Sequence, residues 1–184
     1  MAGNIMGNNI WEGPLGVVQL EYGGLDLGQT MEDTTVEPDQ DIKDILYQQQ
    51  GTKPADYVRT GIVYLVKCKL GEITTDKIEK VMSGIEVSGS GNAVKIGREL
   101  YRSMKTYESK VLKIKRVDSE GSVTTDDDHI IVFYKAISIV TGTIDWGADT
   151  QRGLSIEFRC VWDETEGAFG YSGKASSVGL NPAA

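Results

Sequence analysis

The sequence contains very little of what most enzyme sites are built from. Its 184 residues include one histidine, His129, whereas hydrolase triads, zinc sites and most proton relays need a histidine together with partner residues. Acidic residues are numerous, but they fall in runs such as Asp126–Asp128, which lack the apolar surroundings that would raise the pKa of one carboxyl. We therefore predict that the protein is not an enzyme and has no catalytic residue, metal site or cofactor.

Cysteine is almost as scarce. Cys68 and Cys160 are the only two, and each shares the alternation of its apolar neighbours within a strand-like segment. This position is typical of buried, reduced thiols in a cytosolic protein. A disulfide between core strands is the alternative.

Long apolar runs and a secretory signal are missing as well. No run approaches the roughly 18 to 20 apolar residues that cross a bilayer. Residues 1–13 have neither a basic region nor an apolar signal core. We predict no membrane anchor.

Basic residues are in deficit. The chain has 19 Lys and Arg against 27 Asp and Glu, which gives a formal charge of -8. A protein this acidic repels phosphate backbones, so binding of nucleic acid in a groove is disfavoured. The same charge suits a surface that nucleic acid passes without sticking.

Two ligand motifs are incomplete. The glycine- and serine-rich stretch Ser88–Asn92 lacks both the Gly-Lys-Ser/Thr ending and the third glycine of phosphate-binding loops. Asp39-Gln40-Asp41 starts like a calcium loop, but the glycine and the distal glutamate are not at the required offsets. Neither stretch predicts a ligand site.

What the sequence has in quantity is strand pattern. Residues 154–162 alternate between apolar and polar side chains, which indicates a strand with one buried face. Ile130–Val140 is almost continuously apolar and rich in β-branched and aromatic residues, which favours a strand covered on both faces over a helix. Further strands are predicted over Val18–Tyr22, Leu27–Val36, Tyr57–Leu70 and Tyr107–Val117.

One helix is predicted over residues 74–84. Thr74 or Thr75 can cap its start and Gly84 can end it. Its apolar stripe at i, i+3, i+4 and i+7 consists of Ile78, Val81, Met82 and Ile85. We predict a mainly β fold with two packed antiparallel sheets, a sandwich or open barrel, and one short flanking α-helix.

The chain divides into three predicted parts. Residues 1–15 are read as an irregular N-terminal arm whose Ile10 and Trp11 need burial, for which a neighbouring subunit is one place. Residues 16–173 form the β domain. Residues 174–184, rich in small side chains, are read as a flexible tail.

Within the β domain, residues 32–57 are predicted to form a long acidic loop. Glu32–Gln50 carries six acidic residues against a single base, Lys43. A solvated loop is the simple interpretation, but the apolar side chains of this segment need a partner. They are Ile42, Ile45, Leu46 and Tyr47.

Four short segments follow one another in a characteristic order. The strand Gly61–Leu70 continues through Gly71–Thr74 into the helix. A later strand contains Phe133–Ala136, and the polar turn Asp149–Gly153 then leads into the strand Ile156–Asp163. In this order of elements, from Val17 to Gly173, the sequence resembles the major tail tube proteins of long-tailed bacteriophages.

The resemblance implies two packed sheets whose strands join those of neighbouring subunits in a ring, usually a hexamer. Rings stack into a hollow tube through which the genome passes. The chain would then be a virion tail component made in the host bacterial cytoplasm. Its partners would be further copies, the tape measure, tail tip and terminator proteins, and passing DNA that it does not bind specifically.

The resemblance also assigns residues to tube surfaces. The segment 32–57 corresponds to the family's long loop, which touches the adjacent ring. Its acidic residues Glu37, Asp39, Asp41 and Asp44 are candidates for that loop or for an acidic lumen. The candidate inter-ring or subunit contacts are Ile10, Trp11, Ile42, Ile45, Leu46 and Tyr47.

Two alternatives remain at this point. A contractile-tail or type VI secretion tube subunit would keep the fold and the ring but change what passes through. A monomeric β-barrel that binds a small ligand would instead show a closed apolar pocket.

Overall fold

The protein is described from a computed structural model. The structure describes residues 18–45, 56–71, 74–82, 85–87, 94–96, 108–117, 120–123, 130–141 and 153–182. Every structural statement below concerns these residues.

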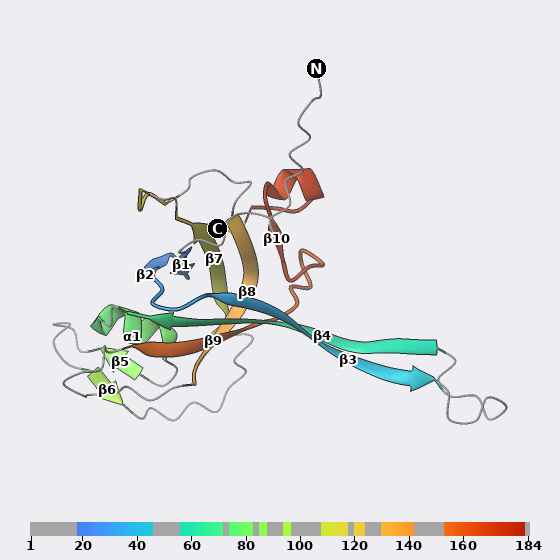
Figure 1. The fold of residues 1–184 in the computed structure, drawn as a ribbon, viewed down its shortest axis with the longest axis horizontal. Coiled ribbons are helices and arrows are strands. Elements are labelled where there is room, and N and C mark those ends of the chain that lie inside the picture. The colour runs from blue at the N-terminus through green and yellow to red at the C-terminus, as the bar shows by residue number, and fades with distance from the viewer. Residues whose placement is uncertain are drawn as a thin grey trace, which may run out of the picture.

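The described residues form ten strands, one α-helix and a C-terminal 3-10 helix (Figure 1). The strands are β1 (Val18–Tyr22), β2 (Leu25–Gln29), β3 (Thr35–Ile45), β4 (Asp56–Leu70), β5 (Ile85–Val87), β6 (Val94–Ile96), β7 (Lys110–Arg116), β8 (Ile130–Val140), β9 (Leu154–Cys160) and β10 (Gly170–Ser172). The helices are α1 (Thr75–Val81) and η3 (Ala175–Val178). The predicted mainly β fold with one short α-helix is confirmed.

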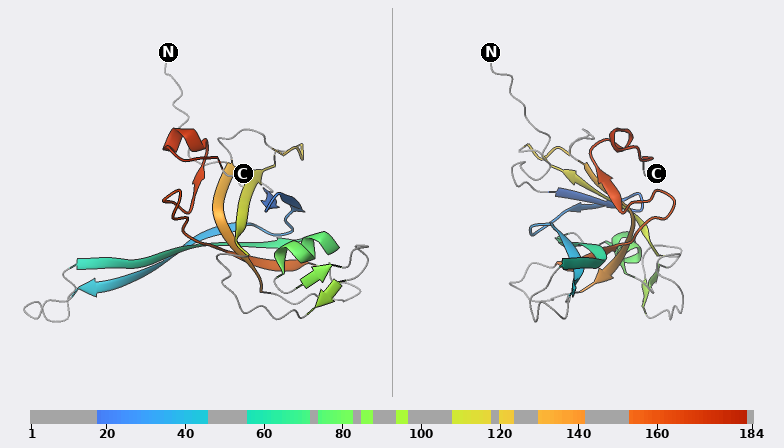
Figure 2. Two further views of the ribbon diagram at one scale, coloured as in Figure 1. Left: turned by 180° about the vertical axis from the view of Figure 1, so that it is seen from behind. Right: turned by 90° about the vertical axis from the view of Figure 1, so that its right-hand side faces the viewer.

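Eight of the strands form one continuous antiparallel sheet. Their order is β2-β1-β7-β8-β9-β4-β3, with β10 on β8, while β5 and β6 pair separately. The sheet folds over, so that β7 and β8 cross β4 and β9 (Figures 1 and 2). After β2, the Met31 N–H donates to the Lys69 carbonyl at 2.8 Å and brings the chain back to the end of β4. The layers of the predicted sandwich or open barrel are therefore two halves of one sheet.

A β-bulge in β8 makes this fold-over. Leu112 pairs with Phe133, whereas Lys110 pairs with Ala136. A distance of two residues on β7 thus matches three residues on β8, so β8 contains the extra residue. An extra residue reverses the side-chain alternation and bends the strand. As a result Phe133 and Ala136, three positions apart, both belong to the core. Beyond the bulge β8 exchanges its neighbour β10 for β9.

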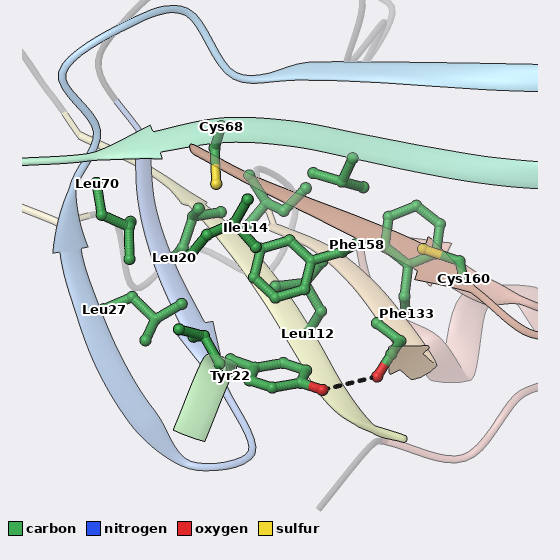
Figure 3. Close-up of a cluster of buried hydrophobic side chains, with 14 of the residues drawn as sticks. Leu20, Tyr22, Leu27, Cys68, Leu70, Leu112, Ile114, Phe133, Phe158 and Cys160 are labelled. Carbon is green, nitrogen blue, oxygen red and sulfur yellow. Dashed lines mark hydrogen bonds between the residues drawn. The ribbon is translucent and has the colours of Figure 1, made fainter. Parts of the chain in front are cut away.

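The core lies between the two halves of the sheet (Figure 3). Tyr22 is fully buried there, with its ring centroid 5.0 Å from that of Phe158. Its hydroxyl donates to the carbonyl of Ala136 at 3.0 Å and lies 3.1 Å from that of Glu108. Desolvation by burial raises the pKa of Tyr22. The ring thus fills space while its hydroxyl, which would be costly to bury alone, is satisfied by backbone.

Both cysteines are buried in this core and are free. Burial raises the pKa of each thiol, Cys68 and Cys160, to about 12. The prediction of buried, reduced thiols is confirmed, and the alternative of a disulfide is wrong.

Helix α1 is shorter than predicted. Thr74 caps it, since its hydroxyl accepts from the Lys77 N–H at 3.4 Å. Val81 is fully buried, and the buried Ser138 hydroxyl of β8 donates to its carbonyl at 2.8 Å. Ile85, predicted to extend the apolar stripe of the helix, belongs to β5 instead.

The C-terminal residues differ from the predicted flexible tail. They form the short helix η3, in which Ala175 is buried against the body while residues 176–179 are exposed. The Tyr134 hydroxyl donates to the Asn181 carbonyl at 2.6 Å, and the Asn181 side-chain amide lies 3.0 Å from the Glu166 carboxylate. Together with Tyr171, whose ring centroid is 5.6 Å from that of Tyr134, these residues cover the outer face of β8. The chain itself thus covers the second face of the first part of β8, a strand that the sequence predicts to be covered on both faces.

The packing of β10 predicts a severe effect of Gly170→Ala. A Cβ at this position would lie 1.9 Å from the Val132 carbonyl oxygen, so β10 could not stay paired with β8. We expect a loss of about 2 to 4 kcal/mol in the free energy of unfolding, measured by urea denaturation. Gly61→Ala, whose Cβ would meet only ordinary contacts from 3.5 Å, should change it little. Equal stability of both variants would contradict this packing.

The buried hydroxyl of Tyr22 gives a second prediction. Tyr22→Phe keeps the ring and removes the hydrogen bond to the Ala136 carbonyl, so we expect a loss of about 1 kcal/mol in the free energy of unfolding. The control is Tyr57→Phe, because Tyr57 is exposed. A Tyr22→Phe protein as stable as the wild type would show that the hydroxyl contributes nothing.

Candidate functional site

The most unusual feature of the molecule is a two-stranded hairpin that extends from the body (Figures 1 and 2). β9 pairs with β4 only from Tyr64 to Leu70. On its other edge β4 pairs with β3, and farther out β3 is its remaining partner among the described residues. We call residues 39–45 and 56–63, the part beyond Tyr64, the projecting hairpin.

This hairpin corrects the expectation of an acidic loop over residues 32–57. Residues 35–45 and 56–57 of that segment are strand. Aspartate and proline are uncommon in strands, which explains the loop interpretation. The missed signal was the period of two in the acidic residues Glu37, Asp39 and Asp41, which is the period of a strand.

One face of the hairpin carries acidic side chains beside apolar ones. Residues opposite each other in an antiparallel pair point to the same side, and successive residues alternate. The register therefore places three acidic residues of β3 in a row beside a mostly apolar row of β4. We call this the acidic face; it consists of Glu37, Asp39, Asp41 and, at its distal end, Lys43 on β3, and of Leu65, Val63, Gly61 and Val58 on β4.

The carboxylates of the acidic face differ in their contacts. Glu37 forms an ion pair with Lys67 at 2.6 Å. The exposed side chains of Asp39 and Asp41 form no hydrogen bond or close ion pair among the described residues, although the charge of Asp39, after the hydrogen bond to Glu37, also helps to raise the pKa of Lys67. Asp44, the fourth predicted acidic residue, lies on the opposite face, since it pairs with Tyr57. The structure thus groups three of the four.

The opposite face carries exposed apolar side chains. Ile42 is 58% and Tyr57 is 62% exposed, and both lie on the side that continues the inner face of the sheet from Tyr64. On the acidic face Val58 and Val63 are also exposed. Large apolar side chains are thus open to solvent on both faces of a two-stranded ribbon, which by itself is marginally stable in water.

The hairpin also leaves a strand edge open. β3 is the last strand of the sheet within the described residues, so its outer edge has no strand beside it. Pro38 lies near the base of the hairpin and has no N–H for an added strand. An added strand would therefore find its donors in the distal part of β3, or along the other edge of the hairpin, where residues 56–63 of β4 extend past β9.

The predicted contact residues have different outcomes. Ile42 is exposed on the hairpin, and Ile45 is half-buried at the end of β3. Ile10, Trp11, Leu46 and Tyr47 lie outside the described residues. Sequence reasoning missed Tyr57, Val58 and Val63, although apolar residues at both even and odd positions of β4 were a signal that both faces need covering.

A second surface feature is a hollow of about 380 Å³ on the body. Lys113 and Lys115 of β7 and the exposed Lys174 line it together with Ile130, Val132 and Tyr171. We call it the basic groove. Its described lining contains three lysines and no acidic residue.

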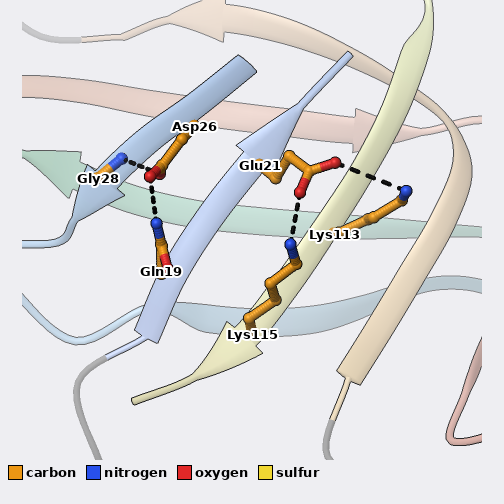
Figure 4. A network of polar contacts seen from close by, with 6 residues as sticks. All are labelled: Gln19, Glu21, Asp26, Gly28, Lys113 and Lys115. Carbon is orange, nitrogen blue, oxygen red and sulfur yellow. Dashed lines mark hydrogen bonds and ion pairs between the residues drawn. The ribbon is translucent and has the colours of Figure 1, made fainter. Parts of the chain in front are cut away.

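Glu21 of β1 holds the two β7 lysines in place (Figure 4). Its carboxylate lies 2.5 Å from the ammonium of Lys115 and 3.5 Å from that of Lys113. The hydrogen bond from Lys115 is the main cause that keeps the pKa of Glu21 below its usual value. In the same network, the Gln19 amide and the Gly28 N–H donate to Asp26.

The described residues offer no group of three or more His, Cys, Asp or Glu side chains that could hold a metal. The space between the halves of the sheet is occupied by core side chains such as Tyr22 and Phe158, whereas a ligand-binding barrel needs that space for its ligand. Nor is any helix of the described part long and apolar enough to cross a bilayer.

Comparisons with known proteins add little. No family model and no curated protein matches the sequence. Among solved structures, a chain in "Cryo-EM structure of the anti-feeding prophage (AFP) baseplate, 6-fold symmetrised" is similar at a TM-score of 0.41 and 8% sequence identity, over 78% of this chain and 86% of that chain. A similarity at this level supports no statement about what the present chain does.

The pKa of Glu21 predicts a pH dependence. A lowered folded-state pKa contributes stability that is full above the unfolded value, near 4.5, and is lost as the pH falls through the lower folded value. Glu21→Gln should therefore lower the free energy of unfolding at pH 7 by at most about 1 kcal/mol, and the difference should shrink below pH 4.5. Urea denaturation at pH 7 and at acidic pH measures it.

Asp33→Asn is the control for this prediction, because it removes the same charge at an exposed position. A Glu21→Gln deficit that stays constant across the pH range would show that the effect is not electrostatic.

Proposed function

We propose that the protein is a structural subunit of a bacteriophage tail tube, in which copies join into rings, six in the family that it resembles, and rings stack around a channel for DNA. The observation that carries this proposal is the projecting hairpin, with exposed apolar residues on both faces and an open strand edge. Such a surface is expected to be covered by another chain.

The position of the hairpin favours association with further copies of the same chain. It extends to one side of the body (Figure 2), so it can contact a surface of a neighbour that lies away from that neighbour's own hairpin. Such a heterologous contact generates a closed ring or an open filament. A ring that stacks is the arrangement that the resemblance implies.

The charge of the chain fits the same role. With 27 acidic against 19 basic residues, a channel built from many copies would repel a passing polyanion rather than trap it. Contacts with tape measure, tail tip and terminator proteins, and a place in the virion tail, belong to this proposal.

Electron microscopy of the purified protein over a concentration series, with light scattering alongside, tests the proposal. We expect rings or tubes with a central hole, at high concentration or after addition of purified tail tips. Ile42→Ser with Tyr57→Ser removes the largest exposed apolar side chains of the hairpin and should abolish assembly without loss of fold. Val178→Ser changes an equally exposed side chain on η3 and should leave assembly intact.

Two results would contradict the proposal. One is a compact monomer at every concentration and in the presence of tail tips. The other is assembly that survives the double substitution in the hairpin.

A further inference from the structure

We propose that the basic groove receives the acidic face of the projecting hairpin of a second copy of the chain. This inference rests on the proposed function only in that copies associate. It identifies the surface that the hairpin occupies and the residues that recognise it.

The groove carries excess positive charge in its described lining. Lys113 and Lys115 share the single carboxylate of Glu21, so one positive charge of the pair is not neutralised. Lys174 at the rim is exposed and adds another. An ammonium group has three donors, which leaves both β7 lysines able to bind a further carboxylate.

The acidic face offers the matching groups. The carboxylates of Asp39 and Asp41 are exposed and form no close ion pair among the described residues, although Lys43 follows Asp41 on the same face and the charge of Asp39 acts on Lys67. Val63, opposite Asp39, is 40% exposed, and Val58, opposite Lys43 farther out on the same face, is 43% exposed. An acceptor of this face must therefore supply positive charge and apolar surface side by side.

The rows on the two surfaces have the same spacing. Lys113 and Lys115 are two positions apart on β7, and Asp39 and Asp41 are two positions apart on β3, so each pair repeats at about 7 Å. The row next to the lysines is apolar, since Lys113 pairs with the buried Val132 and Lys115 with the half-buried Ile130.

The hairpin repeats this arrangement with the opposite charge. Asp39 pairs with Val63, and Asp41 with Gly61. Two ribbons packed face to face can then place carboxylates against ammonium groups and the exposed Val63 near the half-buried Ile130. Gly61, which has no side chain, leaves room in its row for the apolar side chains of the groove.

The occupant is a second copy because the hairpin of the same chain points away from the groove. The groove is lined by the end of β7, the start of β8, β10 and η3. These elements lie in the upper part of the body in Figure 1, whereas the hairpin extends sideways from its lower part. Docking in this way takes Asp39 and Asp41 out of any lumen and assigns them to a subunit contact.

Cysteine cross-linking tests the contact directly. Asp41→Cys and Lys174→Cys proteins are mixed and oxidised with diamide, and the disulfide-linked dimer is followed on non-reducing gels. The native thiols are buried and should not react in the folded protein. We expect this pair to cross-link about tenfold faster than Asp44→Cys with Lys174→Cys, because Asp44 is on the opposite face of the hairpin.

A charge exchange tests the recognition. Asp39→Lys and Lys174→Glu should each weaken association about tenfold in sedimentation velocity experiments. The chain that carries both changes should regain it, because its hairpin and groove are complementary again. Asp44→Lys, with the same change in charge, is the control and should associate as the wild type does.

The outcomes separate this inference from the proposed function. Rings or tubes that form without preferential cross-linking, and without recovery in the doubly changed chain, would overturn the groove while the tube subunit stands. Preferential cross-linking and recovery in a protein that forms only open oligomers would support the groove and contradict the tube. Absence of association, cross-linking and recovery would overturn both.

Discussion

The bulge in β8 is the constraint on which the rest of the structure depends. One antiparallel sheet has to provide both walls of its own core, and it can do so only if a strand shared by both walls bends and keeps apolar side chains inward on each side of the bend. The offset between Leu112–Phe133 and Lys110–Ala136 does both, because the extra residue reverses the alternation. Tyr22 closes the arrangement from β1 by a hydrogen bond to the carbonyl of Ala136, at the inner end of the bulge.

The bulge determines which elements lie beside β8 and thereby the surface of the body. Before the bulge β8 has β10 as its neighbour, and the C-terminal residues cover its outer face. After the bulge it has β9, which in turn pairs with β4. β4 is 15 residues long and β9 only 7, so the distal half of β4 and its partner β3 leave the body as a ribbon. The projecting hairpin is thus a product of unequal strand lengths in a sheet that is otherwise well covered.

The hairpin and the basic groove give the molecule two unlike surfaces. One presents carboxylates and exposed valines, and the other presents lysines above an apolar floor. A subunit with two different complementary surfaces associates head to tail. If the hairpin and the groove bind each other as proposed, rings or filaments would form rather than isolated dimers. The proposed tube subunit is consistent with this asymmetry.

Several parts of the structure followed from the sequence alone. Period-two alternation identified β9, the β-branched run identified β8, and the threonine cap with its apolar stripe identified α1. The scarcity of histidine argued against most enzyme sites, and the parity of the cysteines with apolar neighbours placed both thiols in the core. These are local properties, in which each residue's own pattern carries the information.

Only the tertiary structure decided which strands pair and which segments cover each face of the sheet. Residues 35–45 pair as a strand because β4 offers them the edge that faces away from β9. This pairing outweighs the poor strand propensity of aspartate and proline. The C-terminal residues are anchored because Tyr134 and Glu166, distant in sequence, hold Asn181. The faces of the hairpin, with Asp44 separated from Asp39 and Asp41, depend on strand register, and the basic groove depends on four elements that meet in space. Sequence patterns are local, whereas pairing partners and surface neighbours are set by the whole chain.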